Sequence, residues 1–175
     1  VVLPTEQAQR EGGVAGGATR SASVRCGLAA VPSDATIICV HDAARPFASE
    51  FLFDEVIDAV CAGADGAVPG LPVVDTIKFI DSTNTVMSTP DRRQLVAVQT
   101  PQAFRAKQLR QAHENNPEGT DDSTLVEARG DHKFSVLYMA KTDRPSNETY
   151  ITGIIQSIFL KDYSIDQVDV LYLTA

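Results

Sequence analysis

The sequence predicts an α/β fold built around a mostly parallel sheet. Runs of β-branched and apolar residues alternate along the chain with segments of helical periodicity, and this alternation is typical of βα units. Clusters of Gly, Pro and Asp separate the two kinds of segment, as turn residues do. The chain has 175 residues, of which 43% are hydrophobic, and this is enough for one sizeable core. We therefore expect a single α/β domain over residues 1–175.

The first half of the chain predicts two helices around one buried strand. Residues 19–30 repeat apolar side chains on one helical face and begin at a candidate N-cap, Thr19. Residues 36–41 form a continuous β-prone run, which indicates a strand buried on both faces. Residues 49–62 again show helical spacing, and Ser49 suits the start of that helix.

The second half predicts short strands, turns and two more helices. Pro117 stops the first of these helices, Thr120 is the candidate cap of the second, and Gly130 is its expected end. The segment 150–163 fits either a helix or a strand. We expect strands at 67–74, 76–80, 85–88, 95–99, 134–139 and 167–175 and helices at 105–116 and 120–130.

The charge balance argues against a nucleic-acid surface. The 15 Lys and Arg residues, against 23 Asp and Glu, give a net charge of −8, and no basic stripe is present to follow a phosphate backbone. A few Arg side chains can still hold a small phosphorylated ligand. No run approaches the roughly 18 apolar residues of a membrane span, and no signal peptide opens the chain. The three cysteines lack metal spacing, which indicates free buried thiols. We expect a cytoplasmic protein without membrane or nucleic-acid partners.

The expected strand at 36–41 runs into a group of charged residues. In open α/β sheets, ligands bind outside the carboxyl ends of the strands, and Asp42 follows that end directly. A carboxylate there can hold Mg²⁺ bridged to phosphates, and Arg45 can reach a phosphate in the same crevice. Equally, Asp42 and Arg45 can pair with each other and tie down the turn. We interpret His41 as a packing residue, because no nucleophile stands near it.

A glycine-rich segment, GGATRSASV, leads into the expected helix at 19–30. Gly16 and Gly17 let backbone N–H groups approach a ligand, and a helix N-terminus favours anions. Arg20 adds a positive charge and Ser23 adds a hydroxyl. A plain turn before a helix is the simpler interpretation, and from this segment alone it is the favoured one.

Four further polar residues have ordinary structural interpretations when each is taken singly. Thr76 suits a turn, and Arg92 suits a solvated surface. Thr100 precedes a proline, so its backbone is extended, and its hydroxyl can donate to an anion. Thr120 can cap a helix or bind an oxyanion, and capping is the commoner role.

Six segments that occur in order form one pattern. From about Gly16 to Gly130 the sequence resembles the 2-C-methyl-D-erythritol 4-phosphate cytidylyltransferase family. Ribitol-phosphate cytidylyltransferases are similar to the same family. The segments that carry the resemblance are GGATRSASVRCGL, VHDAARPF, LPVVDTIK, TPDRRQL, QTPQAF and TDDSTLVE.

This resemblance implies a fold, a reaction and a partner. The fold is Rossmann-like, with helices on both faces of the sheet and a protruding β-arm at about 75–99 that reaches across the two-fold axis of a homodimer. The reaction transfers CMP from CTP to 2-C-methyl-D-erythritol 4-phosphate in non-mevalonate isoprenoid synthesis, with Mg²⁺. In such a reaction the protein mainly positions the reactants and neutralises charge.

The resemblance also implies roles for the polar residues. Asp42 would act in catalysis by binding Mg²⁺ and the phosphates. Thr76 and the catalytic Arg92 of one subunit would complete the site of its partner. The acceptor phosphate would be bound by Arg45, Thr100 and Thr120, and the nucleotide by Gly16, Gly17, Arg20 and Ser23.

Two parts of the chain differ from the family pattern. Residues 1–15 do not match the glycine-rich loop, with its Arg and its Pro-Lys pair, that cradles the CTP triphosphate. We therefore expect a domain that lacks its N-terminal βα element and turns over near background by itself. Residues 131–175 are expected to be a divergent C-terminal part. The alternative functions are a non-catalytic dimerising homologue or remnant, and a ribitol 5-phosphate cytidylyltransferase.

Overall fold

The computed structural model describes residues 1–130, 133–138 and 168–173 of the chain. Its strands are β1 (Val2–Leu3), β2 (Val14–Ala15), β3 (Ile37–Asp42), β4 (Gly66–Pro72), β5 (Phe79–Ile80), β6 (Val86–Ser88), β7 (Val96–Val98), β8 (Gln102–Arg105), β9 (Phe134–Tyr138) and β10 (Val168–Leu173). Its helices are α1 (Thr5–Glu11), α2 (Arg20–Ala30), α3 (Glu50–Cys61), α4 (Ala106–Ala112) and α5 (Asp122–Glu127), with a 3-10 turn η1 (Arg92–Gln94).

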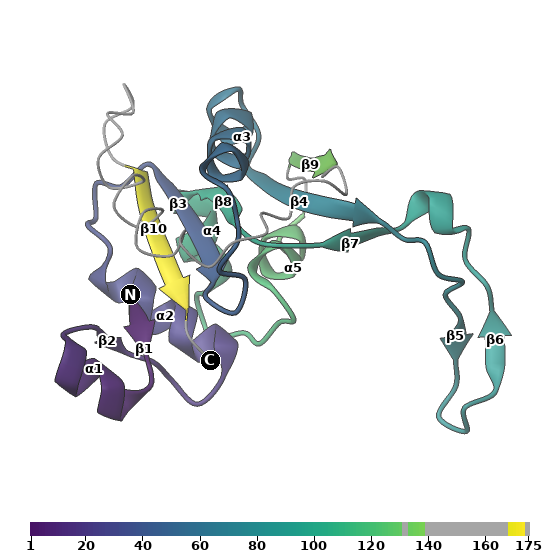
Figure 1. The fold of residues 1–175 in the computed structure, drawn as a ribbon, viewed down its shortest axis with the longest axis horizontal. Helices are drawn as coiled ribbons and strands as arrows, with labels where there is room; N and C mark the ends of the chain where they lie inside the picture. Colours follow the sequence, from purple (N-terminus) through teal and green to yellow (C-terminus); the bar gives the residue numbers. More distant parts are fainter. Residues whose placement is uncertain (131–132, 139–167, 174–175) are drawn as a thin grey trace.

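The described strands form a mixed sheet and a separate two-stranded arm (Figure 1). The sheet follows the order β2-β1-β10-β3-β8-β4-β7, and β9 also pairs with β4. The pairs β1–β2, β1–β10, β3–β10 and β4–β9 are parallel, whereas β3–β8, β4–β8 and β4–β7 are antiparallel. The predicted α/β fold with a mostly parallel sheet is confirmed.

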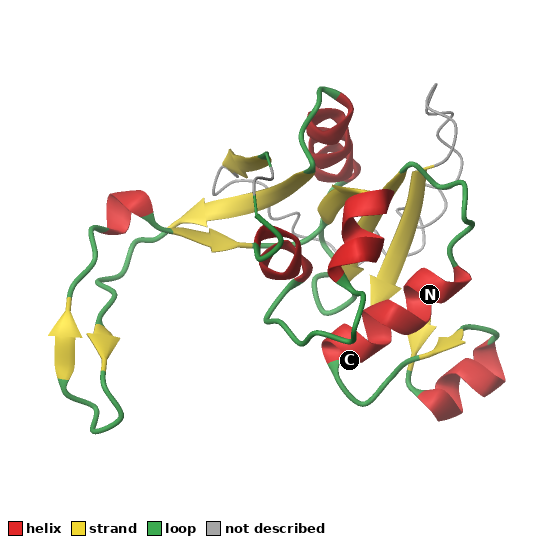
Figure 2. Ribbon diagram, turned by 180° about the vertical axis from the view of Figure 1, so that it is seen from behind, coloured by secondary structure: helices red, strands yellow, loops and turns green. Residues whose placement is uncertain are grey.

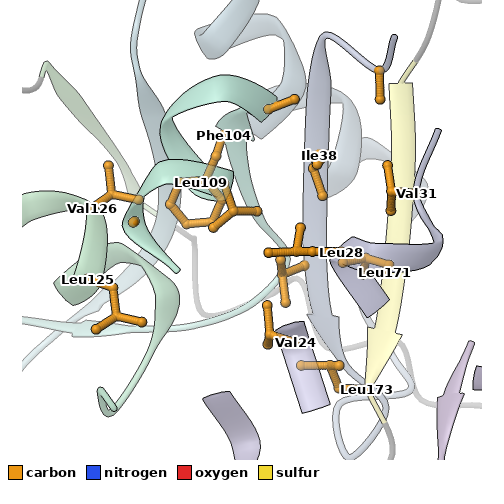
Figure 3. Close-up of a cluster of buried hydrophobic side chains, with 14 of the residues drawn as sticks. Val24, Leu28, Val31, Ile38, Phe104, Leu109, Leu125, Val126, Leu171 and Leu173 are labelled. Atoms are coloured by element: carbon orange, nitrogen blue, oxygen red, sulfur yellow. The ribbon is translucent and has the colours of Figure 1, made fainter. Parts of the chain in front are cut away.

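Strand β3 divides the core into two layers because its side chains alternate between the faces of the sheet. Ile37 and Cys39 pack against α3 on one face. Ile38 and Val40 join a cluster with α2, α4, α5 and β10 on the other face (Figure 3). Helices therefore cover both faces, as expected, and β3 holds its carboxyl end at a fixed edge of the sheet.

Two predicted helix starts are confirmed by their caps. The Thr19 hydroxyl accepts a hydrogen bond from the Ala22 N–H at 3.0 Å, at the start of α2. The Ser49 hydroxyl accepts one from the Leu52 N–H at 3.3 Å, at the start of α3. In both cases a short hydroxyl side chain satisfies an N–H that the helix leaves free.

The cap expected at Thr120 is wrong, because Asp121 caps α5 instead. The Asp121 carboxylate accepts hydrogen bonds from the Thr124 N–H at 2.9 Å and from the Thr124 hydroxyl at 2.6 Å. A carboxylate has more acceptor sites than a hydroxyl, and it also complements the helix dipole. Thr120 therefore lies exposed in the loop before the helix.

Strand β8 and the elements before residue 19 were not expected. β8 follows Pro101 and is only four residues long, but it pairs with both β3 and β4, and this pairing outweighs its weak local signal. Near the N-terminus, β1, α1 and β2 form a small β-α-β unit at the edge of the sheet. The helix expected at 105–116 is limited to α4, because Asn115 and Asn116 have positive φ angles.

The arm projects away from the body of the molecule (Figures 1 and 2). It consists of β5 and β6, which among the described strands pair only with each other, while β7 returns to the main sheet and pairs with β4. The predicted arm at 75–99 is thus a hairpin whose return strand is anchored in the body.

Three other expectations concern cysteines, the membrane and the C-terminal part. All three cysteines are free, but Cys39 alone is buried, Cys26 is half-buried and Cys61 is exposed at the end of α3. None of the helices in the described ranges is long and apolar enough to cross a membrane. The strands expected at 134–139 and 167–175 correspond to β9 and β10, and the segment 150–163 lies outside the described residues.

Candidate functional site

The carboxyl end of β3 is held by hydrogen bonds from both sides of the strand. The Asp42 backbone N–H donates to the Thr100 hydroxyl at 3.2 Å. The Ala43 N–H donates to the Leu173 carbonyl of β10 at 2.7 Å, and the Arg45 N–H closes a turn on the Asp42 carbonyl at 2.9 Å. The backbone that carries the Asp42 and Arg45 side chains is therefore firmly positioned at the edge of the sheet.

His41 ties the same turn to Thr100 from the inside of the fold. Its ring is buried against Phe53 in an edge-on contact, with 5.1 Å between the ring centroids. Its Nε2 donates to the Arg45 carbonyl at 3.1 Å, because a carbonyl can only accept. Its Nδ1 then accepts from the Thr100 hydroxyl at 3.1 Å. Burial lowers the pKa of His41 below its ordinary value, and this favours the neutral ring that the two hydrogen bonds require.

Arg20, the first residue of α2, lies between two carboxylates from different elements. Its Nη1 is 2.8 Å from Asp122 Oδ2, and its Nε and Nη2 are 3.4 and 3.3 Å from Asp42 Oδ1. Burial disfavours the charge, but the Asp122 and Asp42 carboxylates outweigh burial and raise the pKa of Arg20 above its ordinary value. Arg20 is thus a permanent positive charge at this edge.

Asp122 holds this cluster from the interior. Its side chain is 0% exposed, and its Oδ1 accepts from His113 Nε2 at 2.9 Å. Apart from the ion pair with Arg20, its Oδ2 has no hydrogen-bond partner among the residues that the structure describes. Removing one partner of a buried ion pair typically costs about 3–5 kcal/mol, so we expect Arg20 and Asp122 to depend on each other.

The sequence left two interpretations of Asp42 and Arg45, and the structure contains the ion pair. Arg45 Nε lies 3.8 Å from Asp42 Oδ2, with both side chains partly exposed. Arg45 also donates to the Gln99 side chain. A long, exposed ion pair contributes at most about 1 kcal/mol. It ties down the turn only weakly and leaves both groups accessible to a ligand.

The glycine-rich segment is packed tightly against the start of α2. A Cβ at Gly17 would come within 2.4 Å of the Ala22 Cβ, and one at Gly16 would come within 2.9 Å of the Ser23 hydroxyl. The Ser23 hydroxyl accepts from the Gly17 N–H at 3.1 Å and donates to the Thr19 carbonyl at 3.0 Å. Gly16, Gly17 and Ser23 therefore lock the loop onto the helix that presents Arg20.

Thr120 belongs to a loop that is also tied to α2. The Gly119 N–H donates to the Ser21 hydroxyl at 3.2 Å, and Asp121 accepts from the Gln102 amide at 2.9 Å. These contacts flank Thr120 on both sides. Its exposed side chain thus lies in a loop that is fixed to α2, the helix of Arg20, and to β8.

Thr76 and Arg92 lie in the region that leads to and from the arm. Thr76 is exposed between β4 and β5, and Arg92 in η1 donates to the Val74 carbonyl at 2.6 Å. Both views show this region extending away from the body that holds β3 and α2 (Figures 1 and 2). Within one chain, these two residues are separate from the Asp42 cluster.

One carboxylate at this edge has the properties of a magnesium ligand. Asp42 pairs with Arg20 and Arg45 but stays 30% exposed, whereas Asp122 is fully buried against Arg20 and His113. In the described parts of the chain, no group of three or more His, Cys, Asp or Glu could form a metal site by itself. A single carboxylate fits Mg²⁺ that is bound together with substrate phosphates and does not fit a metal held by protein alone.

Sequence reasoning missed Asp122, His113 and Gln99. Asp122 had the appearance of an acid in the first turn of a helix, and His113 that of an ordinary helix residue. The contacts of Asp122 and Gln99 with the predicted residues Arg20 and Arg45 span more than 50 residues of sequence, so no local spacing marks them. The one available signal was the pair of consecutive acids in TDDS, where only one can cap the helix.

The fold and this cluster together define a class of protein. An α/β sheet that gathers a carboxylate, two guanidinium groups and a tightly packed glycine-rich loop at one carboxyl edge is suited to a phosphorylated ligand. The sequence model of one family within that class, described as IspD: 2-C-methyl-D-erythritol 4-phosphate cytidylyltransferase, matches residues 6–137. The chain belongs to this family, and the predicted resemblance is confirmed.

Curated relatives have descriptions that agree with this family. The chain is 47% identical over 135 residues to the 2-C-methyl-D-erythritol 4-phosphate cytidylyltransferase of Nocardia farcinica, covering 77% of this chain and 57% of that protein. It is 49% identical over 123 residues to the bifunctional enzyme IspD/IspF of Oleidesulfovibrio alaskensis, covering 68% of this chain and 31% of that protein. The chain thus spans between about a third and three fifths of these relatives.

Solved structures agree with the fold. The crystal structure of 4-diphosphocytidyl-2C-methyl-D-erythritol synthase from Anaerococcus prevotii has a TM-score of 0.71 at 28% identity, covering 90% of this chain and 77% of that chain. The 2-C-methyl-D-erythritol 4-phosphate cytidylyltransferase of Thermus thermophilus has a TM-score of 0.62 at 33% identity, covering 83% and 70%. The Rossmann-like architecture of the prediction is therefore confirmed.

Proposed function

We propose that the protein transfers CMP from CTP to 2-C-methyl-D-erythritol 4-phosphate and releases pyrophosphate. Family membership supports this reaction class. The observation that carries the proposal in this chain is the cluster of Arg20, Asp42 and Arg45 at the carboxyl edge of β3. The acceptor phosphate attacks the α-phosphorus of CTP, one P–O bond forms and another breaks, and the protein needs to supply only position and charge neutralisation.

In this proposal Asp42 is the protein ligand of Mg²⁺. The ion, when bound with the phosphates, supplies neutralisation of their negative charge. Arg45 binds the acceptor phosphate from the exposed side of the cluster, with Thr120 in the loop before α5. Thr100 contributes by holding Asp42 and His41, since its hydroxyl is already bonded to both.

The nucleotide is proposed to lie against the start of α2. Arg20 provides the fixed positive charge there. The Gly16 N–H already donates to the Leu3 carbonyl and the Gly17 N–H to Ser23, so neither N–H is the proposed donor to the nucleotide. The two glycines contribute instead by having no side chain, which lets the nucleotide lie close to the backbone. The hydrogen bonds of Ser23 hold this loop in the conformation that would contact the nucleotide.

A homodimer is proposed to complete the site in the cytoplasm. The arm and the segment leading to it expose large apolar side chains, which is unusual for a surface without a partner. Thr76 and the catalytic Arg92 would then serve the site of the partner subunit. The exposed apolar residues of this region are Val74, Ile77, Phe79, Ile80, Val86 and Met87.

Calorimetric titration of the 175-residue chain with CTP tests the nucleotide site. We expect binding that depends on Mg²⁺ and that Asp42→Asn abolishes. A matched control, Glu55→Gln on the exposed face of α3, should leave binding unchanged. Absence of CTP binding by a folded chain would contradict the proposal and favour a non-catalytic homologue.

A pyrophosphate-release assay tests the reaction. With CTP, Mg²⁺ and 2-C-methyl-D-erythritol 4-phosphate, pyrophosphate release above the uncatalysed rate would support the proposal. Turnover near background from a folded chain would favour a non-catalytic homologue. Ribitol 5-phosphate, assayed in parallel, distinguishes the two acceptors.

A further inference from the structure

We propose that the buried pair of His113 and Asp122, here called the anchor, positions Arg20 for the nucleotide. The anchor lies on the interior side of Arg20, and the ligand site at the Asp42 edge lies on its exposed side. The identity of the ligand rests on the proposed function, whereas the positioning of Arg20 follows from the geometry of this chain.

The two carboxylate partners of Arg20 are unequal. Asp122 is 0% exposed and contacts Arg20 at 2.8 Å, while Asp42 is 30% exposed and contacts it at 3.3 Å. A cation arriving from solvent can reach Asp42 and cannot reach Asp122. When a cation binds Asp42, the longer contact between Arg20 and Asp42 is the one that breaks, and Arg20 stays in place through Asp122.

His113 gives Asp122 its orientation. The imidazole is buried beyond the end of α4, and its Nε2 donates to Asp122 Oδ1 at 2.9 Å. With Oδ1 occupied, the second oxygen of the same carboxylate faces Arg20. The anchor therefore joins α4 and α5 to the first residue of α2 and, through it, to the end of β3.

Asp121 provides an internal comparison for Asp122. The two acids are adjacent in sequence, but Asp121 caps α5 and binds Thr124, Ser123 and Gln102. Asp121 makes no ion pair with Arg20 in the described structure. Asn also caps helices well, so Asp121→Asn removes a neighbouring charge without removing the anchor.

Nitrogen-15 NMR of the arginine side chains tests the position of Arg20 directly. The Arg20 Nη–H signals, assigned by their loss in Arg20→Lys, should be protected from solvent exchange in the wild type and in Asp121→Asn, because Nη1 is the atom that contacts Asp122. We expect the protection to be lost in Asp122→Asn and in His113→Phe. His113→Gln keeps a side-chain N–H donor and should restore it.

Circular dichroism shows which variants fold. If Asp122→Asn does not fold, the comparison of His113→Phe with His113→Gln decides the question. Equal protection of Arg20 in the wild type and in folded Asp122→Asn or His113→Phe would contradict the proposal that the anchor positions Arg20.

CTP titration of the same variants tests the consequence for the ligand. Loss of one charge-assisted contact should weaken binding by about tenfold in Asp122→Asn, while Asp121→Asn stays near the wild type. Unchanged CTP affinity in a variant that has lost the Arg20 protection would overturn the role in nucleotide binding. If the wild type itself binds no CTP, the proposed function fails, and the NMR comparison still decides whether the anchor positions Arg20.

Discussion

The Thr100 hydroxyl illustrates how one side chain can fix a site without facing a ligand. It accepts from the Asp42 N–H and gives its single proton to His41 Nδ1. His41 in turn donates to the Arg45 carbonyl. Two side chains, those of His41 in β3 and Thr100 shortly before β8, thus share one continuous set of hydrogen bonds with the backbone of Asp42 and Arg45. The sequence analysis predicted that the Thr100 hydroxyl can donate to an anion. In the structure, its proton is already donated to His41 Nδ1.

Thr100→Val, which keeps the shape of the side chain, should therefore destabilise the protein. The Asp42 N–H and His41 Nδ1 would both lose their partner near the interior, and each unsatisfied group typically costs about 1–3 kcal/mol. Urea denaturation measures the change in the free energy of unfolding. Thr89→Val, at an exposed position that bonds only Lys78 in the described structure, should change it by less than about 0.5 kcal/mol. Equal stabilities for the two variants would refute this account.

His41 should make stability depend on pH. Burial lowers its folded-state pKa below the ordinary value of about 6.5, so the unfolded chain binds this proton more readily. Stability is therefore full above about pH 6.5 and falls as the pH drops toward the folded pKa. Asp42 and Arg45, which face the ring, act on its charge in opposite directions.

Thermal melts at a series of pH values measure this effect. His41→Gln keeps a hydrogen-bonding amide and cannot titrate, so its melting temperature should depend less steeply on pH below about 6.5. Parallel curves for the wild type and His41→Gln would show that His41 is not the group involved.

At the scale of elements, α5 depends on a single cap because it is only six residues long. Asp121 accepts from the N–H and hydroxyl of Thr124, from the Ser123 hydroxyl and from the Gln102 amide. Asp121→Ala should lower the free energy of unfolding by about 1–2 kcal/mol, whereas Asp121→Asn should lower it much less. Denaturant titration of both variants measures this difference, and equal losses would assign the effect to charge alone.

Elements with strong local signals were predictable, and elements defined by pairing were not. The continuous run of β3 and the hydroxyl caps Thr19 and Ser49 identify their elements without tertiary information. β8 is four residues long after a proline, and its place between β3 and β4 is decided by two neighbours remote in sequence. The same limit applies to the candidate site. Asp42 was predictable because it stands at the end of a strand, whereas the role of Asp122 depends on its contact with Arg20, which is remote in sequence.

At the scale of the whole molecule, β10 connects the two ends of the chain. It lies between β1 and β3, pairing Leu173 with Val2 on one side and with Asp42 on the other. Its backbone carbonyl at Leu173 also accepts from Ala43, directly after Asp42. The C-terminal part, which was expected to be divergent, thus includes a strand that supports the candidate site. Local sequence gives no indication that β10 pairs with β3.

The arm leads to a prediction about assembly. Phe79 is 59% exposed and Met87 is 68% exposed, and each large apolar side chain buried in an interface contributes about 1.5–3 kcal/mol. If a second copy covers the arm, replacing both residues with serine should raise the dissociation constant of the dimer by at least about tenfold. Because β5 and β6 pair with no other strand in the described part of the chain, the body of the protein should keep its melting temperature.

Analytical ultracentrifugation over a concentration series measures the shift. Phe51→Ser is the matched control, since Phe51 is 65% exposed on α3 and outside the arm, and its sedimentation should match the wild type. The wild type should sediment as a dimer and the arm variant as a monomer at the same concentration. Identical sedimentation of the wild type and the arm variant would contradict an arm-mediated dimer. It would also remove the reason for placing Thr76 and Arg92 in the site of a partner subunit, because those residues lie away from the Asp42 cluster of their own chain.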